Sequence, residues 1–551
     1  MFIPKFLIRT RPLLRFPSQF VKIRHQRTLA DISTVSSRHS FRKGRTYRLV
    51  IRPTLVVVGL GGVIYFTDEH AFSSLLTRSV RALYVMSWIA YEYSMNTTSY
   101  TDINDLHELA ADRLFNLLMA NKGLYIKLGQ AIANQGSVFP LAFQRKLTLL
   151  YDDAPVDDWT MVDSVLRESL GENYESEIFE SIEHVPIASA SIAQVHKAYL
   201  KSNGDPVAVK VQHEYISKQV VIDLFMYRVI SKLYEKVFDL PLSFFTQYIS
   251  DQIAKETDFV HESQNAEHLR DLITHDSSLK GSNIYIPRNY RSISTERVLI
   301  MEWIDGVPLT DKERLIEDGY NLKTIMNQYL KVFGRQIFVY GFIHSDPHPG
   351  NVIARFNNGK QDLVILDHGL YVTLSDSFRT QYCKLWAYLS TFDREGIELI
   401  ARAWGIQYTD MFASFIQLSP PENFQPKTMT VNDLMRGFLG DEKKFPLELL
   451  FLTRAMRIIQ SLNQGLGSPA NRINILTLEL VNTLLSSSSG IFDYIQLFKI
   501  KLALFISNIV FYLFKLRQML YGDKSSKGNG IEDYLDSYMR NTAKSMGIEL
   551  M

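Results

Sequence analysis

The stretch His344-Ser345-Asp346-Pro347-His348-Pro349-Gly350-Asn351, followed by Asp367-His368-Gly369, is the part of the sequence that decides the expected fold. Asp346 precedes Asn351 by five residues, and Asp367 follows sixteen residues later, after the apolar run 363–366. Phosphoryl transfer from a metal–nucleotide needs one carboxylate that orients a hydroxyl or water. It also needs an amide oxygen and a second carboxylate that hold Mg²⁺ against the phosphates. The spacing therefore predicts a catalytic Asp346 with Asn351 and Asp367 as metal ligands. The alternative is a Pro-rich turn between a helix and a hairpin.

A lysine-bearing strand lies upstream of this stretch. The small-residue stretch 186–198 runs into a strand, and the run Val207-Ala208-Val209-Lys210 follows the turn 202–206, which contains Gly204, so the pattern predicts a β-hairpin. Lys210 then stands where a cation meets the α- and β-phosphates of a nucleotide. Taken alone, the run is a strand that ends in an exposed lysine. Together with the downstream acidic residues it indicates an ATP or ADP site.

The loop before the hairpin, residues 186–193, is rich in alanine and serine rather than glycine. Small side chains let the backbone approach phosphates, and we expect Ala190, Ser191 and Ala193 to contact the nucleotide. Alanine resists positive φ, so this loop should be stiffer than a glycine-rich one.

Two further features of the nucleotide site are expected from the sequence. A helix after the lysine strand should offer a carboxylate to Lys210, and both Glu256 and Glu262 are candidates. Residues 284–287 and then 297–308 are predicted to form strands that end in a hinge, where the backbone of Glu302 to Ile304 would meet an adenine edge. Residues 324–341 are predicted to form a helix with a strong apolar face, and this helix leads directly to the segment that begins at His344.

The amino-terminal segment has the composition of a mitochondrial transit peptide. Residues 1–52 hold thirteen Lys/Arg and one acidic residue, Asp31. The alternatives are a disordered basic tail or a nuclear address. The uncharged run 53–67 is shorter than the roughly 20 residues of a full span, but residues 49–51 can lengthen it. We expect a single inner-membrane helix with its basic side in the matrix and the rest facing the intermembrane space. If this segment is instead a buried helix or strand, the protein is a matrix enzyme.

The net charge and the cysteine count argue against several classes of partner and of site. A net charge of +2 gives no argument for nucleic acid as a partner, and a single cysteine, Cys383, excludes a disulfide framework or a Cys-rich metal site. Residues 502–514 are uncharged but too short to span a membrane alone. They predict either a membrane-surface helix or a helix that packs on the domain.

Six motifs occur together between roughly residues 100 and 480. They are Lys127-X-Gly129-Gln130, Gln194-Val195-His196, Val207 to Lys210, Glu256-X-Asp258-Phe259, His344 to Asn351 and Asp367-X-Gly369. With these motifs the sequence resembles the UbiB/ADCK family of atypical, aarF-domain-containing kinase-like proteins. It is most similar to the mitochondrial branch, whose fungal inner-membrane members are associated with coenzyme Q distribution and lipid homeostasis.

The resemblance implies roles that residue patterns alone do not support. Lys127 and Gln130, which periodicity would leave solvated, become site residues on a helix that covers the entry of a protein substrate. Glu256 and Asp258 are implied to face Lys127 across the site. Two departures from the family pattern matter. Ala193 stands where other branches have glycine, which bears on nucleotide affinity, and His368 replaces the usual phenylalanine, which bears on packing.

The resemblance also implies the architecture: an α+β, bilobal protein-kinase-like fold with an N-terminal helical extension and C-terminal helices. We expect a targeting segment at 1–47, a transmembrane helix at 48–72, the extension at 73–180, an N-lobe at 181–304, a C-lobe at 305–485 and a helical tail at 486–551.

Three functions follow as hypotheses. The first is an inner-membrane ATPase or small-molecule kinase that uses Mg²⁺–ATP and acts on coenzyme Q or another lipid. The second is a catalytically silent, nucleotide-binding and lipid-binding scaffold. The complete set Lys210, Asp346, Asn351 and Asp367 favours chemistry over a scaffold. A conventional protein kinase, the third, is the least favoured. The sequence does not identify protein partners.

Overall fold

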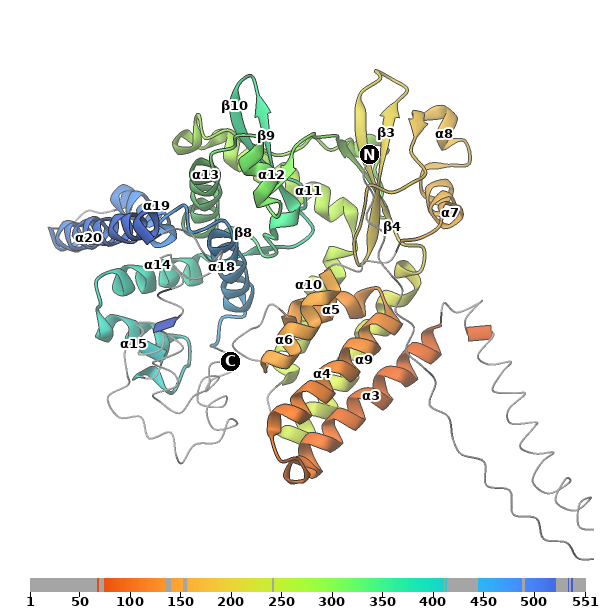
Figure 1. Cartoon of the computed structure of the whole chain (residues 1–551), viewed down its shortest axis with the longest axis horizontal. Coiled ribbons are helices and arrows are strands. Elements are labelled where there is room, and N and C mark those ends of the chain that lie inside the picture. Colours follow the sequence, from red (N-terminus) through yellow and green to blue (C-terminus); the bar gives the residue numbers. More distant parts are fainter. Residues whose placement is uncertain are drawn as a thin grey trace, which may run out of the picture. The chain divides into compact units, whose positions relative to one another are not determined.

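The computed structural model describes residues 67–68, 74–133, 140–151, 156–239, 242–410, 412–413, 444–487, 491–521, 534 and 537–538. The chain divides into two units, Met1–Thr67 and Asp68–Met551, and every element below belongs to the second. The expected targeting segment 1–47 and nearly all of the expected span 48–72 lie outside the described residues and stay predictions. Helices and sheets are mixed, which confirms the expected α+β class (Figure 1).

The N-lobe is built on an antiparallel sheet in the order β1-β3-β4-β6, with β2 paired to β3. Alternation along β4 divides its side chains between two faces. Val207, Val209 and Val211 pack against helix α7, whereas Ala208 and Lys210 face the other side. The expected hairpin is confirmed, because Val195 is paired with Lys210 and Ala198 with Val207. The bounds of these elements are α7 (Trp159–Leu170), α8 (Tyr174–Glu177), β1 (Phe179–Ile182), β2 (Ala188–Ser189), β3 (Ala193–Leu200), β4 (Pro206–Gln212), α11 (Phe259–His275) and β6 (Val298–Glu302).

A helical bundle forms the extension (Figure 1). Two helices that follow β4 in the sequence, α9 and α10, pack with it rather than on the N-lobe sheet, and the Tyr234 hydroxyl of α9 donates to the Met86 carbonyl of α3. The buried Arg78–Asp223 ion pair ties the same two helices. The bundle comprises α3 (Leu75–Met95), α4 (Ile103–Asn121), α5 (Leu124–Ala133), α6 (Leu141–Thr148), α9 (Ile216–Phe238) and α10 (Leu242–Glu256).

The C-lobe surrounds the largest apolar core. Helix α13 contributes Tyr329, Leu330 and Phe333 to that core, and a single π-helical turn, Gln336–Tyr340, carries the chain to Gly341. Gly341 has φ of 62°, a conformation that glycine adopts without strain, and it turns the chain into the 344–351 stretch. The strands are β5 (Ile284–Tyr285), β7 (Val307–Pro308), β8 (Phe342–His344), β9 (Val352–Asn357), β10 (Lys360–Ile365) and β11 (Tyr371–Thr373). The helices are α12 (Lys312–Glu317), α13 (Leu322–Arg335), α14 (Asp376–Ser390), α15 (Arg394–Ala403), α18 (Glu448–Gly465), α19 (Arg472–Ser487) and α20 (Ile491–Tyr521).

The small C-lobe sheets place the expected metal ligands. β10 pairs with β9 in antiparallel register, with Ile365 opposite Val352, so the residues after β10 lie beside those before β9. Asn351 and Asp367 are therefore brought together, although sixteen residues separate them in the sequence.

Candidate active site

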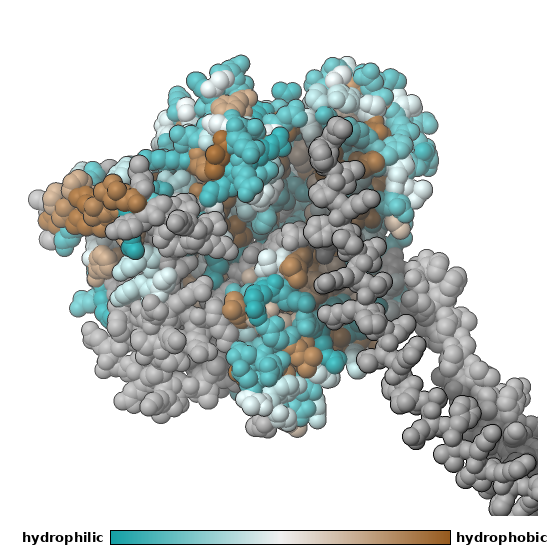
Figure 2. Space-filling model, in the orientation of Figure 1, coloured by the Kyte–Doolittle hydropathy of each residue, from teal (hydrophilic) through white to brown (hydrophobic). Residues whose placement is uncertain are grey.

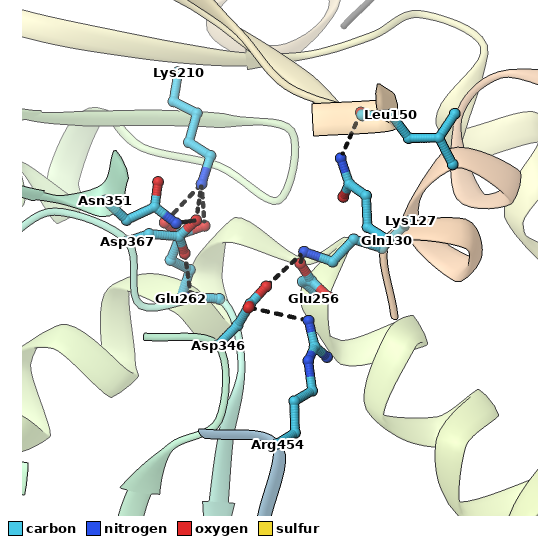
Figure 3. Close-up of polar contacts among 11 residues, drawn as sticks. Lys127, Gln130, Leu150, Lys210, Glu256, Glu262, Asp346, Asn351, Asp367 and Arg454 are labelled. Atoms are coloured by element: carbon cyan, nitrogen blue, oxygen red, sulfur yellow. Dashed lines mark hydrogen bonds and ion pairs between the residues drawn. The ribbon is translucent and has the colours of Figure 1, made fainter. Parts of the chain in front are cut away.

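Lys210 of β4 forms an ion pair with Glu262 of α11 (Figure 3). Its Nζ lies 2.8 Å from both Glu262 carboxylate oxygens and 4.0 Å from Asp367 Oδ2. Burial lowers the pKa of Lys210, but the carboxylates of Asp367 and Glu262 outweigh burial and raise it. Of the two candidate partners that the sequence left open, Glu262 is therefore the one that holds Lys210.

Asn351 and Asp367 form the candidate metal site. Asn351 ends the short 3-10 turn Pro349–Asn351, and its amide nitrogen lies 3.3 Å from Asp367 Oδ2. The Gly369 amide donates to Asp367 Oδ1 at 2.8 Å and fixes the carboxylate. An amide oxygen and a carboxylate are ligands that Mg²⁺ accepts, and Mg²⁺ is usually held by one or two side chains together with substrate phosphates. No group of three His, Cys, Asp or Glu in the described residues could hold a metal alone. The residues present thus fit a magnesium ion that arrives with a nucleotide.

Asp346 is held by cations on both carboxylate oxygens. Lys127 Nζ lies 3.2 Å from Oδ2, and Arg454 of α18 lies 3.0 Å from Oδ1 (Figure 3). Burial raises the pKa of Asp346, but Arg454 and Lys127 together hold it well below its usual range. The expected catalytic carboxylate is therefore ionised and engaged by two helices from outside the catalytic stretch.

Glu256 forms an ion pair with Lys127, as the resemblance implied. Burial raises the pKa of the Glu256 carboxyl, against the lowering effect of Lys127. Asp258 does not share this role. Its carboxylate accepts from the Val260 amide at 2.9 Å and caps the start of α11, so its expected place opposite Lys127 is corrected. The chain turns between α10 and α11 at Thr257 and Asp258, which sends Glu256 and Glu262 to different lysines.

Gln130 lies beside Lys127 on α5, but its amide donates to the Leu150 carbonyl at 3.0 Å (Figure 3). This bond ties α5 to the short turn Leu149–Tyr151. Close packing explains why the motif has a glycine at position 129. A Cβ there would come within 2.5 Å of the buried Leu118 and Leu150 side chains. The motif residues Gly129 and Gln130 thus position the helix that presents Lys127.

Polar side chains of neighbouring segments contact the backbone of the Ala-rich loop. Within it, the Ala190 amide donates to the Ala193 carbonyl at 2.8 Å, while Ser191 and Ala193 are buried. The Ala190 carbonyl accepts from His213, whose other ring nitrogen contacts Asp157 at 2.9 Å. His213 and Asp157 thus hold the loop in place, while its expected stiffness and its expected nucleotide contacts stay predictions.

The hinge after β6 is partly occupied by the protein itself. The Glu302 carboxylate accepts from the Tyr285 hydroxyl at 2.6 Å and from the Arg288 amide, and the Trp303 amide donates to the Pro206 carbonyl. The side chain of Glu302 is thus engaged in structure. Its main-chain carbonyl and the Ile304 backbone stay the predicted adenine contacts.

His196 carries a testable pH dependence. It is fully buried, its Nδ1 donates to the Glu183 carbonyl at 2.7 Å, and its Nε2 accepts from the Gln194 amide at 3.0 Å. Nε2 can accept a hydrogen bond only when the ring is neutral, and burial lowers the pKa of His196. The unfolded chain takes up a proton below about pH 6.5, so folding stability should fall as pH drops, by at most about 1.4 kcal/mol per pH unit.

Denaturant titrations at pH 7.5 and 5.5 measure this effect. The His196→Gln variant should lose less stability between the two pH values than the unsubstituted chain. His275→Gln, a substitution at an exposed histidine in the last turn of α11, should behave like the unsubstituted chain. An identical pH response in the His196→Gln chain would contradict the assignment.

Comparison with known proteins gives the family. A family model described as "ABC1 atypical kinase-like domain" matches residues 149–401. An ABC1 family protein of Schizosaccharomyces pombe is 38% identical over 440 residues, which cover 76% of this chain and 82% of that protein. The chain belongs to the ABC1 atypical kinase-like family. The ABC1 family protein lscO of Purpureocillium lilacinum is 35% identical, covering 75% of this chain and 78% of lscO. The AarF domain-containing protein kinase 1 of Xenopus tropicalis is 33% identical, covering 78% and 86%.

Membership of the ABC1 family implies use of a nucleotide with Mg²⁺ in general terms, and the arrangement above fits that use. Arg454 is the site residue that sequence reasoning missed. It lies on the buried face of α18 between Phe451 and Ile458, and an arginine inside an apolar helical stripe is the signal that could have found it.

Proposed function

We propose that the protein is an atypical kinase-like ATPase of the mitochondrial inner membrane, acting in the distribution of coenzyme Q or another membrane lipid. The observation that carries the proposal is the double engagement of Asp346. Lys127 and Arg454 contact its two oxygens, so α5, which carries Lys127, lies beside the carboxylate that a substrate hydroxyl would have to reach. Water or a small molecule needs far less room than a peptide.

The chain's own residues supply most of what phosphoryl transfer needs. Lys210, fixed by Glu262, would hold nucleotide phosphates beside the Ala-rich loop. Asp367 and Asn351 would hold Mg²⁺, which neutralises charge on the phosphates when bound. Asp346 is ionised and can accept a hydrogen bond from an attacking water or hydroxyl once one of its cations moves away.

The location is proposed from sequence alone. The basic segment 1–47 supports mitochondrial import, and the apolar segment within 48–72 supports an inner-membrane span with the kinase-like unit facing the intermembrane space. Protease added to mitochondria with ruptured outer membranes should digest that unit. Full protection would place it in the matrix instead.

Some relatives are named protein kinases, among them the AarF domain-containing kinase 1 proteins. The contacts of Asp346 favour a non-protein acceptor here. ATP hydrolysis by the full chain should rise when anionic vesicles that contain a quinone-like lipid are added. Vesicles without the quinone-like lipid are the matched control, and an unchanged rate with both would count against a lipid-linked ATPase.

A silent scaffold is separated from an ATPase by Asp346→Asn. This substitution keeps the shape of the side chain but removes its charge. If hydrolysis is the function, cells that carry the variant should lose coenzyme Q-dependent respiration although the protein accumulates normally. Full respiration with the variant would show that the work of the protein does not need the carboxylate.

A further inference from the structure

Helix α20 has two faces of different character. Its inner face packs on the C-lobe through the buried side chains Leu497, Ile500 and Phe511. Polar contacts fix it there: the Asn474 amide donates to the Leu504 carbonyl at 2.9 Å, and the Lys515 ammonium donates to the Gly467 carbonyl at 3.1 Å. Of the two sequence alternatives for 502–514, packing on the domain is confirmed, and the membrane-surface alternative stays a prediction.

The outer face of α20 is a continuous exposed apolar stripe. Its residues recur at helical spacing, and their exposed fractions run from 47% at Ile509 to 72% at Leu520. Figure 2 shows hydrophobic residues gathered at the end of the C-lobe where α19 and α20 lie in Figure 1. The stripe is formed by Phe498, Leu502, Phe505, Ile509, Leu516 and Leu520.

Cations border this stripe. On a helical wheel, Lys499 and Arg517 lie along one edge and Lys501 along the other, and all three are exposed. Lys323 of α13 lies over the Tyr512 ring, 5.7 Å from its centroid. Residues 494–521 contain no Asp or Glu. An apolar face with basic edges is the pattern of a helix that lies in a membrane interface, where the lysine and arginine stems extend toward anionic headgroups.

We propose that the outer face of α20 docks on an anionic lipid bilayer, with the helix lying along the membrane surface. Among the described residues, α20 is the one helix long and apolar enough to cross a membrane, over Tyr494–Gln518. Crossing is disfavoured because Lys499, Lys501, Lys515 and Arg517 fall inside that window and because the inner face would have to leave the C-lobe. A surface position keeps the inner contacts and removes the stripe from water.

A second copy of the chain is a poorer occupant. Packing two such stripes together would bring the basic edges of both helices near one another, and no acidic residue between 494 and 521 could offset them. Anionic headgroups supply that missing charge. The inference concerns a surface far along the chain from the catalytic stretch, and it does not depend on phosphoryl transfer.

The test uses the full chain with Phe505→Cys labelled by a polarity-sensitive fluorophore. Cys383 is buried, so the label is confined to the new cysteine. Ile316→Cys, at an exposed apolar residue of α12, is the matched control. The vesicles are phosphatidylcholine alone or phosphatidylcholine with phosphatidylserine, each also made with lipids that carry a nitroxide quencher near the headgroup or deep in the acyl chain.

With phosphatidylserine vesicles, the label at 505 should shift to shorter wavelength and be quenched most by the shallow nitroxide. The label at 316 should do neither. Replacing Lys499, Lys501 and Arg517 by glutamine should reduce the docked fraction relative to the undocked one by at least tenfold, since each of the three cations is attracted to the anionic surface. Both variants keep every other part of the chain, so any other membrane anchor is common to them and a difference in docking reports on α20.

Four results would overturn the inference. The first is a label that does not change with either vesicle. The second is a shift without vesicles that grows with protein concentration, which would identify a second copy of the chain as the occupant of the outer face. The third is a shift without vesicles that does not depend on protein concentration, which would identify a segment of the same chain as the occupant. The last is strongest quenching of position 505 by the deep nitroxide, which would mean that α20 crosses the bilayer.

Discussion

Asp367→Asn should lower Mg²⁺-dependent ATP hydrolysis by roughly 10²- to 10³-fold, as expected when several kcal/mol of metal stabilisation are lost. Asp367 lies 3.3 Å from Asn351 and 4.0 Å from Lys210, so it is the carboxylate common to the metal site and the phosphate-binding lysine. An asparagine there can still accept from the Gly369 amide, which leaves the backbone of the turn in place.

Initial rates over a range of Mg²⁺ concentrations measure this effect. The variant should need more Mg²⁺ and should reach a lower maximal rate, and its thermal midpoint should change little because the Asp367 side chain is one-third exposed. Asp376→Asn, at an exposed carboxylate on the first turn of α14, is the matched control and should hydrolyse ATP as the unsubstituted chain does. If the Asp367→Asn chain hydrolyses ATP as fast as the unsubstituted chain, Asp367 is not a ligand of the metal.

Lys210→Met should destabilise the chain by about 3–5 kcal/mol, the usual cost of leaving one member of a buried ion pair without its partner. Glu262 is 2% exposed and would be left buried as a lone carboxylate. Burial raises the pKa of Glu262 to about 7 even with Lys210 present. Without Lys210 the carboxyl becomes still easier to protonate, so the cost should be smaller at pH 6 than at pH 8.

The double variant Lys210→Met/Glu262→Leu tests the cause. Removing both charges should recover most of the lost stability in denaturant titrations, because two apolar side chains of similar size can replace a buried pair. Arg145→Met, which breaks an ion pair with both side chains more than half exposed, should cost at most about 1 kcal/mol. A double variant as unstable as Lys210→Met would show that the lysine stabilises the lobe by some other contact.

Local patterns predicted where the residues of the segment 344–369 lie, because its parts are close in sequence or are set by strand pairing; their catalytic role stays a prediction. The Gly204 turn placed Lys210 on the second strand of a hairpin, and the apolar run ending at Leu366 placed Asp367 after a buried strand. These inferences use the two-residue alternation of side chains along a strand and the residue preferences of turns. Neither depends on contacts between distant parts of the chain.

Tertiary contacts decided the remaining assignments. Glu256 and Glu262 look alike in sequence, and only the turn at Thr257 and Asp258 sends them to Lys127 and Lys210 respectively. Arg454 reaches Asp346 from a helix that begins about a hundred residues later, so no local pattern could pair them. The roles of Lys127 and Gln130 came from family resemblance, and the structure separates them: Lys127 contacts Asp346, whereas Gln130 donates to Leu150.

The fate of the γ-phosphate tests the central claim most directly, namely that this is a phosphoryl-transfer site whose acceptor is not a protein. The full chain is incubated with Mg²⁺ and ATP labelled at the γ-phosphate, together with a mixture of protein substrates and anionic vesicles that contain a quinone-like lipid. The account predicts label in inorganic phosphate or in the lipid fraction, abolished by Asp367→Asn, with none in the added proteins. Label that enters the added proteins and disappears with Asp367→Asn would contradict it.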